Sequence, residues 1–502
     1  MPLTSGKTSH PIWLIICVVL LLLTAVATIL RLTNQAYWFD EVFTILFSGG
    51  GIYRRIPPSE ILSRVASDVW PPLYNLLIAG WGGILGWSEF SLRVFSLFTG
   101  LIGIAIVYRL GSEAKSPRVG VLLALLLATC PFYLSYFTEA RAYTLYFTLT
   151  AASLWLYWHI PALKKIKRLY ALVFLLTLSA LFYTHYIGLA TGGALGIYHL
   201  LIARQDPLWR RHWNKTLLLM LLSVLVFSPW LVVAIISAIR ESADRRGMDA
   251  LSIVYWSLYG FGNGLLPYSL AMLSLAIWRI RGRTINFAWF LLIVTLLIAL
   301  AFNLYADFLF HIRHIIVILP PFLLIIALVL DMLWVRVRWA AVLGMTIWVV
   351  AGIYGYVMPD FINGLPGQVE KLPRSFIINA VNTLKSCADT NDVAVFALSL
   401  PEKEWLNDRV LQYYLHEVSI PYAQVKSMAN IGSPPVVDGT NPQIVTPPPD
   451  DYNQRVQEFV GSAQQVWLFS LDTNGASALI EQFTDALSPM PDVQVLKNRT
   501  GC

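Results

Sequence analysis

The sequence is poor in charged residues. Only 13% of its 502 residues are Asp, Glu, Lys or Arg, whereas 57% are hydrophobic and the mean hydropathy is +0.62. Soluble domains carry about 25% charged residues, because their surfaces must interact with water. The composition therefore excludes the few soluble domains that the length alone would suggest, and it indicates a protein whose solvent is lipid.

Cysteine is also scarce, with four residues in the whole chain. Cys17 and Cys130 lie within apolar runs, where we expect them to be small buried hydrophobic side chains. Cys387 and Cys502 lie in the polar C-terminal part, and a disulfide between them is an option if that part is exported. The Cys and His residues show no spacing typical of a metal site.

The net charge of +7 does not indicate a nucleic-acid partner. The basic residues line neither a helix face nor a tail, and instead fall in short loops between apolar runs. In a membrane protein, Lys and Arg are retained on the cytoplasmic side. We therefore expect membrane lipids as partners and no nucleic acid.

Eleven apolar runs are candidates for membrane crossings, since a span needs roughly 20 predominantly apolar residues. The first, 11–30, could be a signal peptide because Ala25-Val-Ala27 resembles a cleavage site, but its length and the spans that follow favour an uncleaved helix. The others are 91–110, 119–137, 140–160, 169–184, 187–203, 216–238, 265–280, 285–304, 314–333 and 339–357. The predicted fold is mainly α, a polytopic membrane protein with about 11 transmembrane helices.

Every second loop is basic, which predicts the orientation. If the N-terminus is cytoplasmic, the inner loops hold Lys115 and Arg118; Lys164, Lys165, Lys167 and Arg168; Arg204, Arg210, Arg211 and Lys215; Arg281 and Arg283; Arg336 and Arg338. Outer connections near 138, 186 and 305–313 carry little excess positive charge. We therefore predict a multi-pass protein of the cell membrane with a cytoplasmic N-terminus and an exported C-terminal part.

One further apolar segment, 71–86, is short and interrupted by Pro and Gly. Counting it as a crossing would invert the charge pattern of all later loops. We therefore predict a helix at the outer interface, within a first outer loop of residues 32–90. Trp70, Trp81 and Trp87 suit the headgroup level there.

From about Met358 the apolar runs become strand-sized. Predicted strands at 392–398, 465–471 and 493–496 alternate with helical patterns at 405–416 and 476–487, which is typical of a small α/β domain. We therefore predict two domains, a transmembrane domain over 1–357 that includes the first outer loop, and an extracytoplasmic domain over 358–502. The second domain has no catalytic motif, and either acceptor binding or a stabilising role would suit it.

Carboxylates follow the first predicted span. Asp40 and Glu41 stand in Trp38-Phe-Asp-Glu41, and Asp68 comes later in the same loop. Acids beside hydrocarbon are costly to place, so they are site candidates, although a solvated loop start is the alternative explanation. Two separated acids can act as a base and as a group that orients a phosphate or a metal ion. A divalent cation held by Asp40 and Asp68 therefore remains an option, and we expect no other cofactor.

Other polar residues lie at later outer turns. Glu139, Arg141 and Tyr143 precede one span, His185 lies at the next outer turn, and Arg313-His314 at the last. Arg141, Arg313 and His314 are suited to binding a phosphate. For His185 alone, a packed polar core residue is the favoured explanation. Together these residues predict a water-facing cavity at the outer surface for an anionic lipid substrate.

These motifs resemble those of the membrane glycosyltransferases of the C-type fold, specifically the protein O-mannosyltransferase and lipid A aminoarabinose transferase group, glycosyltransferase families 39 and 83. The resemblance covers about the first 320 residues in the family's order. Its motifs are Trp38-Phe-Asp-Glu41, Pro71-Pro-Leu-Tyr74, Ser88-Glu-Phe-Ser-Leu-Arg93, Ser135-Tyr-Phe-Thr-Glu-Ala-Arg-Ala-Tyr143, His185-Tyr-Ile-Gly188, and Arg313 followed by Pro320-Pro321.

The resemblance implies a polyprenyl- or dolichyl-phosphate sugar donor and an inverting transfer of a hexosyl or pentosyl group to a lipid, glycan or protein acceptor of the cell envelope. By the same resemblance, Asp40 is the general base or acceptor-orienting acid, Glu41 supports it and Asp68 is a second acid. Arg313 would hold the donor phosphate, stabilising the charge of the leaving lipid phosphate.

The same resemblance implies that Arg141, Glu139 and His185 support the site, and we add Tyr143, which shares a helix face with Glu139. Two positions depart from the family pattern. Trp70 stands where many relatives have a basic residue or His, and His314 stands where Tyr usually follows the Arg. Both changes fall near the donor, so the identity of the transferred sugar is not predicted.

Two alternatives belong to other classes. A transporter or flippase of lipid-linked sugars predicts charged or broken spans at the midplane and internal repeats, and the sequence shows neither. An assembly factor that anchors the exported part would not explain the carboxylates.

Overall fold

The computed structural model describes residues 11–68, 70–241, 247–306, 309, 311–358, 360–366, 373–398, 408–428, 433–437, 452–470, 483–490 and 493–497. The chain forms two compact units. The helical unit comprises Met1–Leu32, Phe47–Gly50 and Arg55–Gln368, and the sheet unit comprises Thr33–Leu46, Gly51–Arg54 and Val369–Cys502. Two pieces of the predicted first outer loop thus group with the C-terminal residues.

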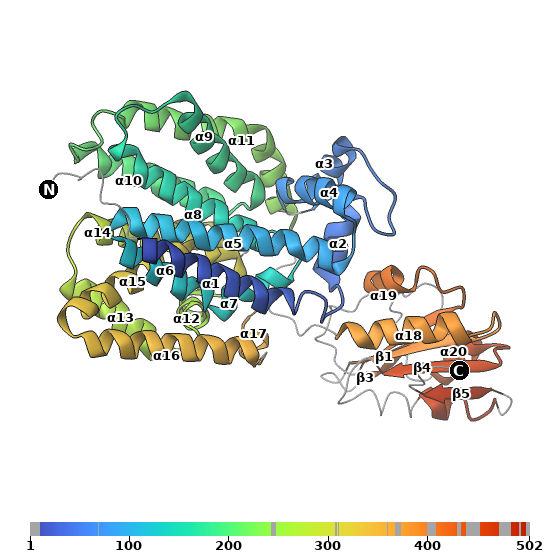
Figure 1. Ribbon diagram of the computed structural model, residues 1–502. Helices are drawn as coiled ribbons and strands as arrows, with labels where there is room; N and C mark the ends of the chain where they lie inside the picture. The colour runs from blue at the N-terminus through green and yellow to red at the C-terminus, as the bar shows by residue number, and fades with distance from the viewer. Residues whose placement is uncertain are drawn as a thin grey trace. The chain divides into compact units, whose positions relative to one another are not determined.

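The helical unit is built almost entirely from helices (Figure 1). In chain order they are α1 (Pro11–Ile29), α3 (Pro58–Ala66), α4 (Leu73–Leu85), α5 (Glu89–Ala114), α6 (Pro117–Ala128), α7 (Pro131–Ser135), η1 (Tyr136–Thr138), α8 (Tyr143–His159), η2 (Ile160–Ala162), α9 (Arg168–Thr184), α10 (Gly188–Leu201), η3 (Ala203–Gln205), α11 (Trp213–Glu241), α12 (Ala250–Phe261), α13 (Leu266–Arg279), α14 (Arg283–Ala306), η4 (Ile312–Ile318), α15 (Leu319–Arg336), α16 (Arg338–Val357) and α17 (Asp360–Asn363). The helix α2 (Phe39–Ser48) has residues in both units. The predicted mainly α class is confirmed.

Fewer than eleven of the described helices are long and apolar enough to count as membrane crossings. Six described helices are long and apolar enough to cross, or eight if each of two bent pairs forms one span. The helices α8, α9 and α10 have 17, 17 and 14 residues, which at about 1.5 Å per residue is shorter than a hydrocarbon core of about 30 Å. Each predicted run does coincide with a helix or a bent pair, but the count of eleven is not confirmed.

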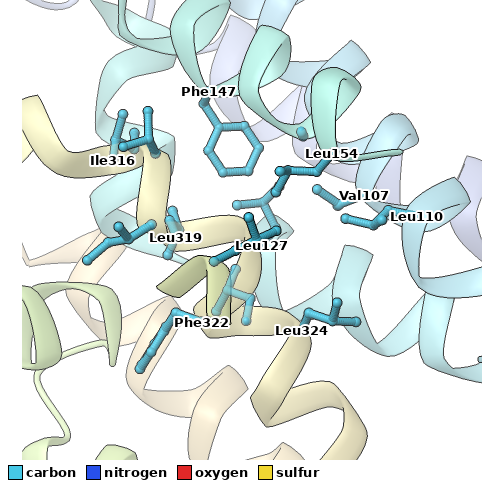
Figure 2. Packing of buried hydrophobic residues seen from close by; sticks show 14 of the residues in the cluster. Val107, Leu110, Leu127, Phe147, Leu154, Ile316, Leu319, Phe322 and Leu324 are labelled. Carbon is cyan, nitrogen blue, oxygen red and sulfur yellow. The ribbon is translucent and has the colours of Figure 1, made fainter. Parts of the chain in front are cut away.

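Burial separates the centre of the helical unit from its periphery. Of the candidate span Ile312–Arg336, 94% is buried, whereas the figure is only 17% for α1 and 22% for α11. Figure 2 shows the packing around α15, with labelled side chains Val107 and Leu110 of α5, Leu127 of α6, Phe147 and Leu154 of α8, Ile316 of η4, and Leu319, Phe322 and Leu324 of α15. A central helix that is apolar all round is surrounded by protein, and the outer helices expose their apolar side chains to lipid.

Two apolar helix pairs among the described residues are sharply bent, as in a broken span or a re-entrant loop, which the sequence did not predict. The axis bends by 58° between α6 and the α7–η1 segment, and by 95° between α12 and α13. Asn263, at the second break, adopts a left-handed conformation with φ of +56°, and its Nδ2 donates to the carbonyl oxygens of Thr129 (3.1 Å) and Trp348 (3.2 Å). The two breaks therefore lie together, and one side-chain amide satisfies carbonyls of the first break and of α16.

The predicted inner loops gather at one end of the helical unit, which we call the basic end. The contacts that join them are Arg118 Nε to Asp331 Oδ1 (2.5 Å), Thr284 Oγ1 to the Ala114 carbonyl (2.7 Å), His212 Nε2 to the Leu163 carbonyl (2.7 Å) and Arg283 Nε to Asp206 Oδ2 (3.3 Å). The structure thus places these loops on one side, as the charge pattern predicts. Which side of the membrane they face stays a prediction.

The segment predicted to lie at the interface is the separate helix α4. Its 13 residues span about 20 Å, too little for a crossing. Trp81 Nε1 donates to the carbonyl oxygen of Ser91 in α5 at 2.8 Å, so α4 packs on the neighbouring helix. The length agrees with the predicted interfacial helix, although its depth in a bilayer stays a prediction.

The described residues of the sheet unit form five strands in the order β3-β2-β1-β4-β5. They are β1 (Val393–Leu398), β2 (Tyr422–Met428), β3 (Ser433–Val437), β4 (Gln465–Ser470) and β5 (Gln494–Lys497), and the described helices are α18 (Arg374–Cys387), α19 (Asp408–Leu415) and α20 (Tyr452–Val460). β1 pairs parallel with β2 and β4, β4 pairs parallel with β5, and β3 is antiparallel to β2.

The three predicted strands are present, and two strands were not predicted. β3 contains two prolines and forms an edge of the sheet, where missing N–H donors are tolerated, and β2 has little apolar alternation. The predicted helix at 405–416 is observed as α19. Most of the other predicted helix, 476–487, lies outside the described residues. Within its described part, residues 483–486 are helical.

Residues from the predicted first outer loop are tied to this unit by backbone contacts. Gln35 forms an isolated antiparallel bridge with Pro373, and the Arg374 amide donates to the carbonyl oxygen of Asn34 at 2.9 Å. The Tyr37 amide donates to the Tyr414 hydroxyl at 2.7 Å. The first outer loop therefore contributes to a fold whose other parts lie more than 300 residues later.

The cysteines follow the expected division. Within the described residues, Cys17 and Cys130 are buried and free, and Cys387 is disulfide-bonded. Cys502 lies outside the described residues, so its pairing with Cys387 stays a prediction.

Candidate functional site

The turn between α9 and α10 fixes a buried histidine. His185 follows α9 directly and is 1% exposed. The Ile187 amide donates to its Nδ1 at 3.2 Å, and its ring stacks on Tyr146 of α8 with centroids 4.5 Å apart and an interplanar angle of 12°. The imidazole is therefore held in one orientation by a backbone donor and an aromatic plane.

Two more rings surround His185. Trp70, which precedes α4, and His314, in η4, lie with ring centroids 5.1 and 5.5 Å from that of His185, and 5.4 Å from each other. The Tyr146 hydroxyl donates to the carbonyl oxygen of His314 at 3.3 Å. We call Trp70, Tyr146, His185 and His314 the aromatic cluster, and the end of the helical unit that carries it the site end.

Two guanidinium groups adjoin the aromatic cluster. Arg141 lies 5.9 Å from the ring centroid of Trp70, and Arg313 lies 5.4 Å from that of Tyr143. Arg313 is 5% exposed and Arg141 is half-buried. Such positions above aromatic faces stabilise a cation, but burying a guanidinium remains costly without an anion nearby.

The protonation of His185 reflects this environment. Burial, and then the positive charges of Arg141 and Arg313, lower the pKa of His185 to about 3. The ring is therefore neutral at physiological pH, so the positive charge of the site resides on the two arginines.

Two of the predicted acids, Glu139 and Asp68, belong to the helical unit. Glu139 is 1% exposed, and its carbonyl oxygen accepts from Ser96 of α5 at 2.6 Å. Asp68 is half-buried. Burial and the negative charge of Asp68 raise the pKa of Tyr186 to about 12, while a hydrogen bond from Trp230 opposes the shift. Asp68 therefore lies close enough to the α9–α10 turn to influence its charge balance.

Asp40 and Glu41 lie in the sheet unit, in the first turn of α2. Glu41 is fully buried, and its Oε2 accepts from the Trp38 amide at 3.3 Å, an interaction that caps the start of the helix. Asp40 is half-buried, and its carbonyl oxygen accepts from Thr44 Oγ1 at 2.9 Å. Of the two carboxylates, Glu41 has an evident structural role and Asp40 keeps access to solvent.

The structure thus brings together five of the predicted site residues in the helical unit: Arg141, Tyr143, His185, Arg313 and His314. Asp68 acts on the neighbouring Tyr186, and Glu139 stands two residues before Arg141. Their proposed roles stay predictions. Tyr146 was not predicted as a site residue. Trp70, predicted near the donor and at the headgroup level, packs its ring against two histidines, and its depth in a bilayer stays a prediction. Tyr146 lies one helical turn after Tyr143, which was the only available signal.

An apolar cavity of about 210 Å³ begins at the same turn. Tyr186 and Ile187 line it together with residues of α10, α11 and α14, among them Leu231 and Phe302. Its walls are almost wholly hydrocarbon. A hydrocarbon chain would suit this cavity, which is lined by the two residues that follow His185.

A metal site is not evident from side-chain grouping. Within the described part of the chain, no three His, Cys, Asp or Glu side chains gather in a way that could hold a metal ion. The site end instead concentrates two arginines. A divalent cation held by Asp40 and Asp68 stays a prediction.

Comparisons with known proteins agree with the predicted resemblance. A family model described as dolichyl-phosphate-mannose-protein mannosyltransferase matches residues 69–233, about one third of the chain. This segment holds Trp70, Arg141, Tyr146 and His185. No curated protein matches the sequence.

Solved structures match over most of the chain. The crystal structure of ArnT from Cupriavidus metallidurans bound to undecaprenyl phosphate covers 87% of this chain and 98% of its own, at 12% identity and a TM-score of 0.56. Its apo form covers 83% and 93%, at 12% identity and a TM-score of 0.53. The Archaeoglobus fulgidus oligosaccharyltransferase covers 82% and 69%, at 12% identity and a TM-score of 0.44. The two ArnT matches show that the chain is similar in fold to a C-type membrane glycosyltransferase, and the predicted resemblance is confirmed.

Proposed function

We propose that this chain is a glycosyltransferase that moves a sugar from a polyprenyl-phosphate donor to a lipid, glycan or protein acceptor at the outer face of the cell membrane. The observation that carries the proposal is the pair Arg141 and Arg313 around a neutral, buried His185, directly beside an apolar cavity. A phosphate joined to a long hydrocarbon chain matches both features. The bound undecaprenyl phosphate in the similar ArnT structure supports this choice of carrier.

The two arginines would act most strongly on the leaving group. As the bond between the anomeric carbon and the phosphate oxygen breaks, the lipid phosphate gains negative charge. Arg313 is almost fully buried, so its charge is little screened by water and stabilises that change. His314 and Arg141 would orient the phosphate, and Tyr143 and Glu139 would position the arginines.

The acceptor would react on the opposite face of the sugar. Its hydroxyl oxygen forms a bond to the anomeric carbon while the phosphate leaves with the bonding electron pair, and the hydroxyl proton passes to Asp40. We assign the base to Asp40 because Glu41 is buried and engaged by the Trp38 amide. Asp68 would orient the acceptor or hold a divalent cation, and the transferred group would be a hexose or a pentose.

The first test measures transfer in membranes that contain the full chain. Each of a panel of radiolabelled polyprenyl-phosphate hexoses and pentoses is added, and labelled product is separated from donor. Asp40→Asn should abolish transfer from the accepted donor, whereas a change at Glu60, a half-buried acid of α3 paired with Arg64, should not; the control variant is Glu60→Gln. Normal transfer by Asp40→Asn at wild-type abundance would contradict the assignment of the base.

The second test concerns orientation. Asn34, Ser67 and Arg210 are exposed, and each is replaced by Cys for labelling with a membrane-impermeant thiol reagent on intact cells. Asn34→Cys and Ser67→Cys should label from outside, and Arg210→Cys only after permeabilisation. Labelling of Asn34→Cys and Ser67→Cys from opposite sides would rule out a shared reaction centre.

A flippase of lipid-linked sugars remains the alternative from another class. Broken spans are a feature of transporters. Here Asn263 at one break donates hydrogen bonds to carbonyl oxygens of Thr129 at the other break and of Trp348. Proteoliposomes decide between the two classes. Movement of a fluorescent lipid-linked sugar across the bilayer, without any covalent product from the wild-type chain, would favour the flippase.

A further inference from the structure

A second cavity lies at the basic end of the helical unit, away from the aromatic cluster. It has a volume of about 390 Å³ and is formed by the turn between α13 and α14 together with one side of α15. Five cationic side chains line it: Lys115, Arg279, Arg281, Arg283 and Arg336. The proposed transfer reaction uses none of them.

The cavity keeps most of its positive charge. Its one acidic lining residue, Asp331, is engaged by Arg118 at 2.5 Å. Arg283 pairs with Asp206 at 3.3 Å. Among the residues that the structure describes, Lys115, Arg279 and Arg336 have no ion pair. Three cations therefore face one cavity without a protein anion to neutralise them, which favours an anionic ligand.

The wall between α13 and α14 adds to this preference. Gly282 makes the turn with φ of +128°, and a Cβ at this position would meet only open space. The helix α14 begins at the next residue, so its first N–H groups, which lack acceptors within the helix, lie at the cavity. The remaining lining residues are mainly aliphatic, such as Ile285, Leu328 and Val335.

Exposed tryptophans indicate where this end lies relative to lipid. Trp278, beside Arg279, is 79% exposed, and Trp339, beside Arg338, is 71% exposed. Tryptophan is enriched at the headgroup level, because its ring is amphipathic. A cavity at that level, cationic on one side and aliphatic on the other, matches a phospholipid headgroup better than a free ion.

We infer that this cavity binds the phosphate group of an anionic membrane phospholipid. Cations that serve only to set membrane orientation need no common cavity, since that function depends on their number in short loops. Here residues from three separate loops, those of Lys115, Arg279 and Arg336, converge on one concave surface that also offers hydrocarbon contact. The inference does not depend on the proposed transfer reaction.

The test is native mass spectrometry of the full chain in detergent, titrated with phosphatidylglycerol or with phosphatidylcholine. The wild type should retain phosphatidylglycerol in preference to phosphatidylcholine. Arg279→Gln combined with Arg336→Gln should weaken phosphatidylglycerol binding about tenfold, because each cation near a lipid surface contributes on the order of a several-fold gain in affinity. The matched control, Arg204→Gln with Arg210→Gln, removes the same charge from exposed positions at the same end and should bind like the wild type.

Further arms address folding and the source of the phosphate. Arg279→Lys with Arg336→Lys should restore binding, which shows that the loss follows charge and does not follow misfolding. Sodium phosphate at millimolar concentration should not displace the lipid. The inference is overturned if sodium phosphate does displace it, if phosphatidylcholine binds equally well, or if the control variant weakens binding as much as the cavity variant.

Discussion

The two ends of the helical unit differ in how deeply they bury arginine, although both place arginines against aromatic rings, as Arg283 over Trp158 and Arg338 over Trp334 at the basic end. At the site end, Arg141 and Arg313 lie against aromatic faces, and Arg313 is almost fully buried. At the basic end, arginines such as Arg210 and Arg279 are exposed. A buried charge is costly unless it acts on a partner, whereas an exposed one costs little. This difference in burial is consistent with the proposed reaction site at one end and with the proposed lipid contact at the other.

The largest expected difference concerns activity. Arg313→Gln should lower the rate of sugar transfer by about 10²–10³-fold, because a buried donor aimed at a developing negative charge contributes on that scale. Transfer from a saturating polyprenyl-phosphate sugar is measured in membranes with matched protein abundance. Arg210→Gln, with the same loss of charge at the other end, should retain full activity. Equal activities for the two variants would remove the distinction between the ends.

The next effect is a pH dependence of stability to which His185 at the site end contributes. His185 has a pKa of about 3 in the folded protein against an ordinary value of 6.5, so below pH 6.5 the unfolded chain takes up a proton that the folded chain does not. Its contribution to stability is complete above pH 6.5 and decreases by about 1.4 kcal/mol for each pH unit down to about pH 3. Thermal unfolding in detergent at several pH values measures this slope.

The control for this slope is His185→Phe. The substituted ring still stacks on Tyr146 but cannot titrate, so the unfolding temperature should depend less on pH between 6.5 and 4.5 than in the wild type. An unchanged slope would assign the acid sensitivity to other groups.

A smaller effect is expected from the ion pair between Arg118 and Asp331 at the basic end. Asp331→Asn should lower the free energy of unfolding by about 1–2 kcal/mol, because the pair is partly exposed on the Arg118 side and only the aspartate is buried. The thermal midpoint in detergent gives the measurement. The double variant Arg118→Gln with Asp331→Asn should lose less free energy of unfolding than Asp331→Asn alone. A loss equal to the sum of the two single-variant losses would show that the pair does not interact.

The smallest effect is expected for exposed cations of the basic end. Arg210→Gln should change the free energy of unfolding by no more than about 0.5 kcal/mol, since surface substitutions away from packed groups fall within that range. A loss of several kcal/mol in the same thermal assay would show that exposed cations at this end contribute strongly to stability.

The sequence was most informative where the signal is local. Apolar runs predicted all the long helices, and three strand-sized runs predicted β1, β4 and β5. It failed for β2, which lacks apolar alternation, and for β3, whose prolines are tolerated only because it forms a sheet edge. It also missed the breaks in two spans, because Asn263 reaches Thr129 and Trp348, which lie far away in the chain.

The candidate site was predictable in its list of residues and not in its arrangement. Outer turns gave Arg141, His185 and Arg313 from hydropathy and resemblance. Only the structure showed that Tyr146 stacks on His185 and that Trp70 packs between two histidines. It also showed that Glu41, adjacent to Asp40, is buried and caps its own helix.

By itself the sequence determined that this chain needs lipid, which loops share a side, and which polar residues stand at the ends of helices. Each of these properties follows from the transfer free energy of a short segment. The tertiary structure decided which of those polar residues meet, which arginine is buried and which stays exposed, and where cavities remain beside them. Those properties depend on how helices pack over hundreds of residues, and the free energy of such contacts is not contained in any one segment.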